Sequence, residues 1–221
     1  MLDLKYKNKI IQVACDGAGA TGKSTGAKMI SKKFKLKFLS SGLLYRYAAL
    51  LIIKNNPKNH IPYLKKKFKN LNYSKIEKIN LHSPEISKKS SEIAKVKSIR
   101  DILKKFQINF SEKDKKCCIE GRDIATKILP NSDIKFFFTC NLKIAASRRY
   151  KELKKFNKSI SLKDVKKSLR KRNFLDINRK NSPLLKHPES IEIDSGKLTK
   201  QAMLAKMIKN VEKVIKTKYG K

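Results

Sequence analysis

The feature that most constrains this chain is a glycine-rich segment near its start. Four of the eight glycines lie within ten residues, and Gly17–Ser24 fits the pattern G-x-x-x-x-G-K-[ST] of loops that wrap phosphate groups. A short apolar run, Ile10–Cys15, precedes the segment, and a helical pattern, Thr25–Phe34, follows it. A strand, a glycine turn and a helix N-terminus in this order point backbone N–H groups at an anion. In a chain so poor in glycine the full pattern arises by chance about one time in a hundred, so we interpret the segment as a phosphate-binding loop.

Short apolar runs alternate with helical patterns along the chain. The predicted strands are Ile10–Cys15, Leu36–Leu39, Cys117–Glu120, Ile134–Thr139 and Ile191–Asp194. The predicted helices are Thr25–Phe34, Leu43–Ile53, Glu85–Phe110 (broken near Val96–Ser98), Leu142–Phe156, Leu162–Arg179 and Thr199–Lys216. The stretch Lys54–Lys78, rich in Lys and Asn, is the least patterned and is predicted to be an insertion or a mobile flap. The alternation indicates an α/β fold, with a parallel sheet covered by helices and ligands at the carboxyl ends of its strands.

The composition is strongly basic, with 55 Lys and Arg against 18 Asp and Glu and a formal net charge of +37. Only eight of the basic residues are arginines, and the lysines are spread through nearly every segment. This spread indicates a general bias toward lysine, so we expect no dedicated nucleic-acid surface, only weak and salt-sensitive binding to polyanions. A guanidinium grips phosphate with two parallel hydrogen bonds, which an ammonium does not reproduce. The few arginines are therefore candidate phosphate-binding residues.

Two arginines lie just after predicted strands. Arg46 follows the pair Ser41-Gly42 by one turn of a predicted helix, and Arg122 lies beside Asp123 directly after the predicted strand Cys117–Glu120. For Arg46 the alternative is a capped helix that carries an exposed arginine. Two adjacent charged residues at a strand end, such as Arg122 and Asp123, are poor material for packing and good material for binding a ligand.

Two further groups lie within predicted helices. Arg172, Asp176 and Arg179 recur at i, i+4 and i+7 and so share one face. The alternative is a solvated ion pair worth a few tenths of a kcal/mol, but the rest of that face is not rich in arginine. Ser91 and Arg100, nine residues apart, form a pair that is weak on its own.

Taken in order, these motifs resemble the bacterial cytidylate kinase family, the CMP/dCMP kinase branch of the nucleoside monophosphate kinases. The resemblance covers nearly the whole chain from Ile10 to Ser195. It rests on Asp16-Gly17-x4-Gly22-Lys23-Ser24-Thr25, Ser41-Gly42-x2-Tyr45-Arg46, Ser83-Pro84-Glu85, Ser91 with Arg100, Gly121-Arg122-Asp123, Arg148-Arg149 and Arg172-x3-Asp176-x2-Arg179. Among the departures, Asn173, Leu175 and Ile177 replace residues that are commonly charged in the family.

The resemblance implies a P-loop kinase with a five-stranded parallel sheet flanked by helices, a monophosphate-binding insertion at 43–110 and a helical lid at 157–182, all in one domain over 1–221. It implies transfer of the γ-phosphoryl group of ATP to CMP or dCMP with Mg²⁺. The ATP site would comprise Gly17, Ala18, Gly19, Ala20, Thr21, Gly22, Lys23, Ser24, Thr25 and Arg148. Ser24 would offer its hydroxyl to Mg²⁺, and Arg148 or Arg149 would stack near the adenine or join the lid.

The resemblance also implies an acceptor site and a set of catalytic charges. The CMP site would comprise Ser41, Tyr45, Arg46, Ser91, Arg100, Arg122, Asp123, Arg172 and Asp176. Arg46 and Arg122 would hold the monophosphate, and Asp176 would meet the ribose. A pocket that selects cytosine needs an acceptor for its N4 amino group and a donor for N3 and O2, roles that fall to Asp123 with Ser91 and to Arg100. The catalytic residues would be Lys23, Arg122, Arg172 and Arg179, with no general base required.

Two other readings stay open. One is a P-loop kinase for another nucleoside monophosphate, and the other is a basic ATP- or RNA-binding protein. The segment Met1–Lys9 lacks the apolar region of a leader, and no stretch reaches the length of a membrane span. We therefore expect a cytoplasmic monomer whose partners are small nucleotides.

Overall fold

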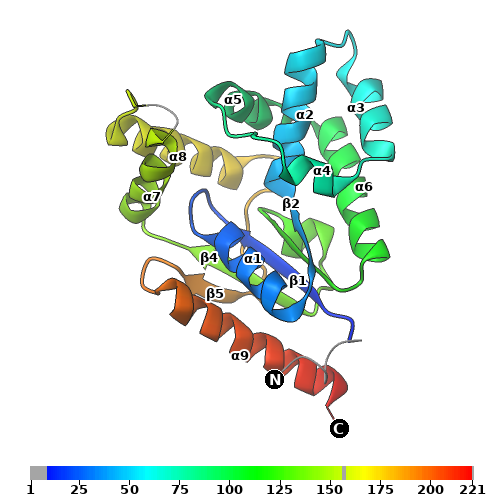
Figure 1. Cartoon of the computed structure of the whole chain (residues 1–221), viewed down its shortest axis with the longest axis vertical. Coiled ribbons are helices and arrows are strands. Elements are labelled where there is room, and N and C mark those ends of the chain that lie inside the picture. The colour runs from blue at the N-terminus through cyan, green and yellow to red at the C-terminus, as the bar shows by residue number, and fades with distance from the viewer. Residues whose placement is uncertain (1–8, 156–157, 221) are drawn as a thin grey trace. The chain divides into compact units, whose positions relative to one another are not determined.

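The computed structural model describes residues 9–155 and 158–220, which contain a five-stranded parallel sheet flanked by helices (Figure 1). The strand order is β2-β3-β1-β4-β5. The strands are β1 (Gln12–Gly17), β2 (Lys37–Ser40), β3 (Cys117–Gly121), β4 (Ile134–Thr139) and β5 (Ile191–Asp194). The predicted α/β fold class is confirmed. The last two strands have the predicted bounds, whereas β1 begins and ends two residues later than Ile10–Cys15.

The chain forms two compact units. One consists of the described residues of 1–38 and 115–221, and the other of Leu39–Asp114. The first unit carries most of the sheet and the helices α1 (Lys23–Phe34), η1 (Ile124–Ile128), α7 (Leu142–Lys154), α8 (Leu162–Asn178) and α9 (Lys200–Tyr219). The second carries α2 (Ser41–Asn55), α3 (His60–Lys69), α4 (Tyr73–Glu77), α5 (Pro84–Ile93) and α6 (Lys97–Lys113).

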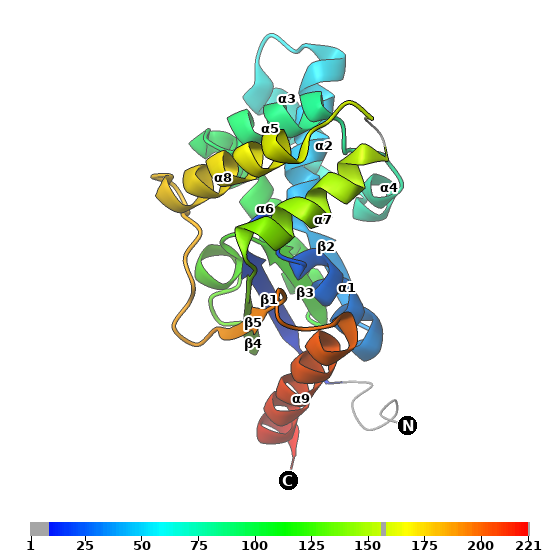
Figure 2. The ribbon, with the colours of Figure 1, turned by 90° about the vertical axis from the view of Figure 1, so that its left-hand side faces the viewer.

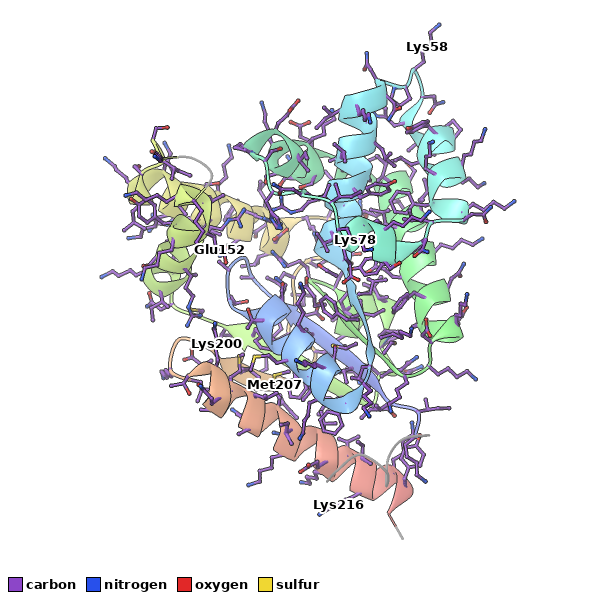
Figure 3. The ribbon with its side chains drawn as sticks, in the orientation of Figure 1. Lys58, Lys78, Glu152, Lys200, Met207 and Lys216 are labelled. Carbon is purple, nitrogen blue, oxygen red and sulfur yellow. The ribbon has the colours of Figure 1, made fainter. Side chains whose placement is uncertain are left out.

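The core of the first unit lies between the sheet and the pair α1 and α9. Alternate residues of β1 and β4, among them Val13 and Phe136, are fully buried against these helices. Figure 3 shows Met207 directed from α9 toward the sheet and Lys216 projecting away from it. This alternation along the strands and along α9 is the pattern of elements that bury one face. It fixes β1, and with it the loop at its end, as a rigid support.

The helices α7 and α8 pack against each other through a smaller apolar cluster, and Figure 2 shows both beside the sheet-bearing part of the same unit. Its buried members are Ala146, Val165 and Leu169. Ala20 of the glycine-rich segment packs against this cluster, so the predicted lid helix α8 and the phosphate loop are in contact here. The predicted helix end at Phe156 and the predicted lid start at residue 157 lie outside the described residues.

The second unit corrects one expectation about the stretch Lys54–Lys78, which holds two ordered helices, α3 and α4. Leu64 and Phe68 of α3 are buried one turn apart, and the Phe68 ring meets that of Phe106 edge-on at 6.0 Å. The numerous lysines around these two residues obscure the apolar period in the sequence. The predicted break in Glu85–Phe110 is confirmed, since α5 ends at Ile93 and α6 begins at Lys97.

Within the described ranges, no helix combines the length and the apolar composition needed to cross a bilayer.

Candidate active site

The glycine-rich segment connects β1 to α1 as the sequence predicts. Gly22 has φ +76°, a left-handed conformation that favours glycine, and α1 begins directly after it at Lys23, two residues before the predicted start. The loop is fastened to itself, because the Thr21 hydroxyl donates to the carbonyl oxygen of Ala18 at 3.0 Å. No acidic residue occupies the first turn of α1. No carboxylate of the first turn therefore competes with a bound anion for the positive end of the helix.

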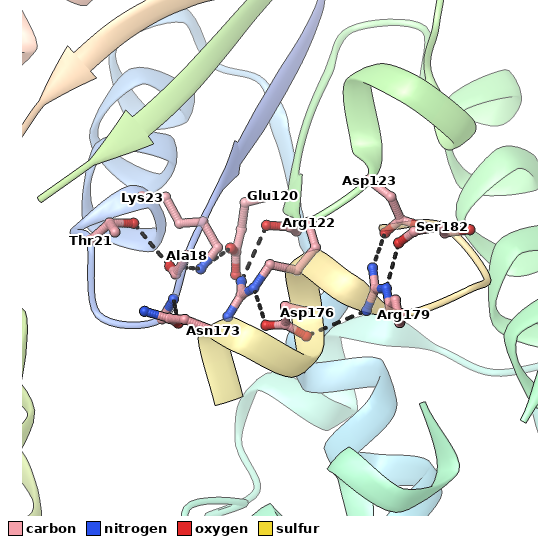
Figure 4. Close-up of polar contacts among 12 residues, drawn as sticks. Ala18, Thr21, Lys23, Glu120, Arg122, Asp123, Asn173, Asp176, Arg179 and Ser182 are labelled. Atoms are coloured by element: carbon pink, nitrogen blue, oxygen red, sulfur yellow. Dashed lines mark hydrogen bonds and ion pairs between the residues drawn. The ribbon is translucent and has the colours of Figure 1, made fainter. Parts of the chain in front are cut away.

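Lys23 is the charged residue most closely tied to this loop. Its side chain is buried, with Nζ 3.4 Å from the carbonyl oxygen of Ala18 and 3.6 Å from Oε2 of Glu120 (Figure 4). Burial lowers the pKa of Lys23 to about 8, and the positive charge of Arg122 acts in the same direction against the opposing charge of Glu120. A negative charge added beside this lysine would stabilise its protonated form. Glu120, at the end of β3, was not among the predicted site residues.

Arginines and carboxylates of the predicted acceptor site pair with one another. Arg122 donates from Nε to Oδ2 of Asp176 at 2.8 Å, and Arg179 lies 3.5 Å from Asp176 and 3.7 Å from Asp123 (Figure 4). Burial would raise the pKa of Asp176, but the guanidinium groups of Arg122 and Arg172 outweigh it and lower the pKa. All of these side chains belong to the first unit. The structure thus brings together residues that the sequence places on a strand end and on a helix face more than 50 residues later.

The helix α8, which is part of the predicted lid, also contacts the phosphate loop directly. The backbone N–H of Gly19 donates to Oδ1 of Asn173 at 3.1 Å. A Cβ at Gly19 would lie 3.0 Å from Cδ2 of Leu169, so a side chain there would require the Leu169 side chain to shift. The Asn173 amide oxygen thus accepts a hydrogen bond from the N–H group of Gly19, and a phosphate oxygen bound in the loop would accept the same bond. The sequence marks Asn173 only as a departure from the family, without a role.

Arg148 of α7 is linked through Ser195 to Thr21 of the phosphate loop. Its guanidinium donates to the Ser195 hydroxyl at 3.0 Å and to the Ser195 carbonyl oxygen at 2.8 Å. The Ser195 hydroxyl in turn donates to the carbonyl oxygen of Thr21 at 2.7 Å. Ser195 is buried at the end of β5 and was not predicted as a site residue. Its signal in the sequence is its place directly after the predicted strand Ile191–Asp194, on the edge of the sheet where ligands bind.

Of the predicted acceptor-site residues, Arg172 lies on α8 in the first unit, and the five not yet described lie in the second unit. Buried Arg46 donates to the carbonyl oxygen of Leu81 at 2.9 Å and to the Ser87 hydroxyl at 2.8 Å. The Ser91 hydroxyl donates to the Ser87 carbonyl oxygen at 3.1 Å, so Arg46 and Ser91 share one neighbour. Ser41 is buried at the start of α2. The guanidinium group of Arg100 stacks on the ring of Tyr45, with its central carbon 5.6 Å from the ring centre.

The oxygen donors near the loop fit a cation that is bound mainly through phosphate. Ser24 is exposed in the first turn of α1, and the Glu120 carboxylate lies 3.6 Å from Lys23. Among residues 9–155 and 158–220, no three His, Cys, Asp or Glu side chains are grouped so as to hold a metal ion by themselves. Mg²⁺ prefers one or two protein oxygens together with phosphate oxygens, and these residues offer that set.

Comparison with known proteins identifies the family. The cytidylate kinase family model matches residues 13–213. The cytidylate kinase of Fusobacterium nucleatum is 35% identical over 215 residues, covering 92% of this chain and 98% of the relative. That of Clostridium tetani is 33% identical over 226 residues, covering 96% and 98%. A crystal structure of an uncharacterized protein from Eubacterium ventriosum shares the fold with a TM-score of 0.56 and 16% identity, covering 93% of this chain and 99% of that one. The chain belongs to the cytidylate kinase family, a family of kinases.

Proposed function

We propose that this protein transfers the γ-phosphoryl group of ATP to CMP or dCMP, giving ADP and CDP or dCDP. The observation that carries the proposal is the meeting, in one compact unit, of the phosphate loop with the cluster of Arg122, Asp176 and Arg179. The loop alone supports only the binding of a nucleoside triphosphate. A second set of phosphate-binding charges beside it supports a reaction between two nucleotides.

The donor nucleotide would be held by Gly17–Thr25. Its backbone N–H groups and the start of α1 would bind the β- and γ-phosphates, and Lys23 would add a mobile charge. Arg148 would lie near the adenine, a position supported by its contact with Ser195 at the rim of the loop. Mg²⁺, held by Ser24 and the phosphates, would neutralise charge on the transferred group.

The acceptor is assigned to the residues that the family resemblance implies. Arg46 and Arg122 would hold its phosphate, and Asp176 its ribose, with Ser41 and Tyr45 lining the site. Asp123 and Ser91 would accept from the N4 amino group of cytosine, and Arg100 would donate to N3 and O2. Arg122 and Asp176 lie 2.8 Å apart in the structure. On binding, the phosphate of the acceptor would compete with Asp176 for the Arg122 guanidinium, so that Arg122 would exchange one partner for the other.

The chemical step needs positioning and charge neutralisation. Arg172 lies on α8, the helix that contacts the phosphate loop through Asn173, and Arg179 follows directly after the end of that helix. From there they would neutralise the charge that develops on the transferred phosphoryl group. The phosphate loop and the acceptor residues would hold the two nucleotides in line and exclude water from the transferred group. No proton acceptor is assigned.

A coupled assay of ADP release tests the proposal across CMP, dCMP, UMP, AMP and dTMP. We expect CMP and dCMP to be the best acceptors. Equal or faster turnover with UMP or AMP would reject the assignment to cytidine nucleotides and favour a kinase for another monophosphate. No turnover with any of them, together with tight and salt-resistant RNA binding, would favour a basic nucleotide- or RNA-binding protein.

Arg122→Lys tests the use of a planar guanidinium. The lysine keeps the charge but loses the paired hydrogen bonds, so we expect kcat/KM for CMP to fall at least tenfold, about 1.4 kcal/mol. The melting temperature should change little, because lysine keeps the positive charge beside Asp176. Arg170→Lys, an exposed substitution on α8, is the matched control. Unchanged kinetics in Arg122→Lys would contradict its role at the acceptor phosphate.

The pKa of Lys23 predicts how nucleotide binding depends on pH. Burial lowers the pKa to about 8 in the free protein, and bound phosphates favour the charged form. The charged form is therefore lost as the pH rises through 8, and the Kd for ADP should be about tenfold higher at pH 9 than at pH 7. Titration calorimetry in buffers of different ionisation enthalpy should show proton uptake on binding at pH 8. A wild-type Kd as constant over this range as that of Lys23→Met would refute the prediction.

A further inference from the structure

Asp16 is a buried carboxylate to which the proposed reaction assigns no task. It lies in β1 directly before Gly17 and is 1% exposed. Both of its oxygens accept backbone hydrogen bonds from η1: Oδ1 from the N–H of Ile124 at 2.9 Å, and Oδ2 from the N–H of Ala125 at 2.7 Å. Asp16 also lies opposite Gly121 in the pairing of β1 with β3. One side chain thus links the strand before the phosphate loop to the segment after β3.

That segment carries Arg122 and Asp123, the two residues immediately before η1. Asp123 occupies the N-cap position of η1 but makes no side-chain cap hydrogen bond, and its carboxylate lies 3.7 Å from Arg179. An aspartate at an N-cap ordinarily accepts from the first turn of its own helix. Here Asp16 accepts those hydrogen bonds from another strand, and the Asp123 carboxylate is directed to the charged cluster.

We propose that Asp16 is a positioning residue for the acceptor nucleotide, which holds the backbone of Ile124 and Ala125 and thereby sets Arg122 and Asp123 in register with the phosphate loop. The inference rests on the proposed function, in which Arg122 and Asp123 bind CMP. A buried carboxylate is costly unless it is fully hydrogen-bonded. A local cap by Asp123 would satisfy the N–H group of Ala125 without that cost, but it would occupy the carboxylate that the acceptor site requires.

The charge state of Asp16 gives the inference a second measurable consequence. Burial raises the pKa of Asp16 to about 7, against the two backbone hydrogen bonds that lower it. The charged groups that face it are Asp123, which raises the pKa, and Arg122, which lowers it. The neighbouring Cys15 thiol, whose own pKa is raised by burial, stays neutral. Below pH 7 the carboxyl takes up a proton, and one of its oxygens becomes a donor that faces an N–H group.

Asp16→Asn tests this role with almost no change in volume. The amide offers one acceptor and one donor, so one of the two N–H groups of η1 loses its partner. We expect the KM for CMP to rise about tenfold at pH 8, with the KM for ATP within twofold of the wild type. At pH 5.5 the wild-type carboxyl is itself protonated. The KM for CMP of the variant, divided by that of the wild type, should therefore fall toward one at this pH.

Asp133→Asn is the matched control, because Asp133 accepts from the backbone N–H of Gln12 at 2.8 Å, at the opposite end of β1. Both variants are expected to melt earlier than the wild type, but only Asp16→Asn should change the KM for CMP. A KM for CMP as little changed as in Asp133→Asn overturns the inference while leaving the proposed function standing. A wild type that phosphorylates no cytidine nucleotide overturns both. Should Asp16→Asn not fold, the wild-type kcat/KM for CMP, corrected for ionisation of the phosphate, decides: a fall below pH 7 supports the inference, and a flat profile rejects it.

Discussion

Lys23→Met is expected to lower kcat for phosphoryl transfer by about 100- to 1,000-fold, a loss typical of removing one preorganised charge from a site of developing negative charge. Lys23 is the buried cation of the phosphate loop, within 3.4 Å of the Ala18 carbonyl oxygen. Methionine fills a similar volume and leaves the loop without a charge for the β- and γ-phosphates. Steady-state kinetics with saturating CMP, with ATP varied, measure the effect.

Lys33→Met on the same helix is the control, since Lys33 is exposed and lies two turns or more from the loop. It should leave kcat within twofold of the wild type. The variant Lys23→Met leaves Glu120 without its lysine, so its melting temperature is compared with that of Lys23→Met/Glu120→Gln. Restored melting without restored activity separates the catalytic loss from the loss of the ion pair. More than a tenth of wild-type kcat in Lys23→Met would contradict a catalytic role.

The sequence predicts the fold well where β-branched and aromatic residues gather in short runs. The bounds of β4 and β5 match because Ile134–Thr139 is rich in aromatic and β-branched residues and Ile191–Asp194 alternates isoleucine with acidic residues. The helices α3 and α4 are missed because their cores rest on few residues, such as Leu64 and Phe68, set among lysines. There the packing against α6 decides the structure, and no local pattern records that packing.

The site divides in the same way. The phosphate loop is predictable because the residue types that define it lie within eight consecutive residues, Gly17–Ser24. The pairing of Gly19 with Asn173 joins residues 154 positions apart, and that of Asp16 with Ala125 joins residues 109 apart. Such contacts depend on strand register and on the packing of α8, which spacing along the chain does not specify. Residue type and the family resemblance therefore predict Arg122, Asp176 and Arg179 as ligands of a nucleotide, but do not predict that they pair with one another.

Gly17→Ala is expected to lower the free energy of unfolding by at least about 3 kcal/mol, from the sum of backbone strain and overpacking. Gly17 has φ +154°, which L residues rarely adopt, and an added Cβ would lie 2.5 Å from the backbone carbonyl oxygen of Phe138. That carbonyl belongs to the buried strand β4, paired with β1 at this point, so neither partner is able to yield.

Gly42→Ala supplies a control of opposite sign for Gly17→Ala. Gly42 lies in α2, and an added Cβ there meets nothing closer than the Ser40 Oγ at 3.7 Å. Alanine in a helix is favoured over glycine, so we expect a gain of about 0.5 kcal/mol. Urea denaturation followed by circular dichroism measures both variants. A Gly17→Ala variant as stable as Gly42→Ala would mean that β1 and β4 separate easily at the phosphate loop, contrary to the rigid support on which the loop's hydrogen bonds depend.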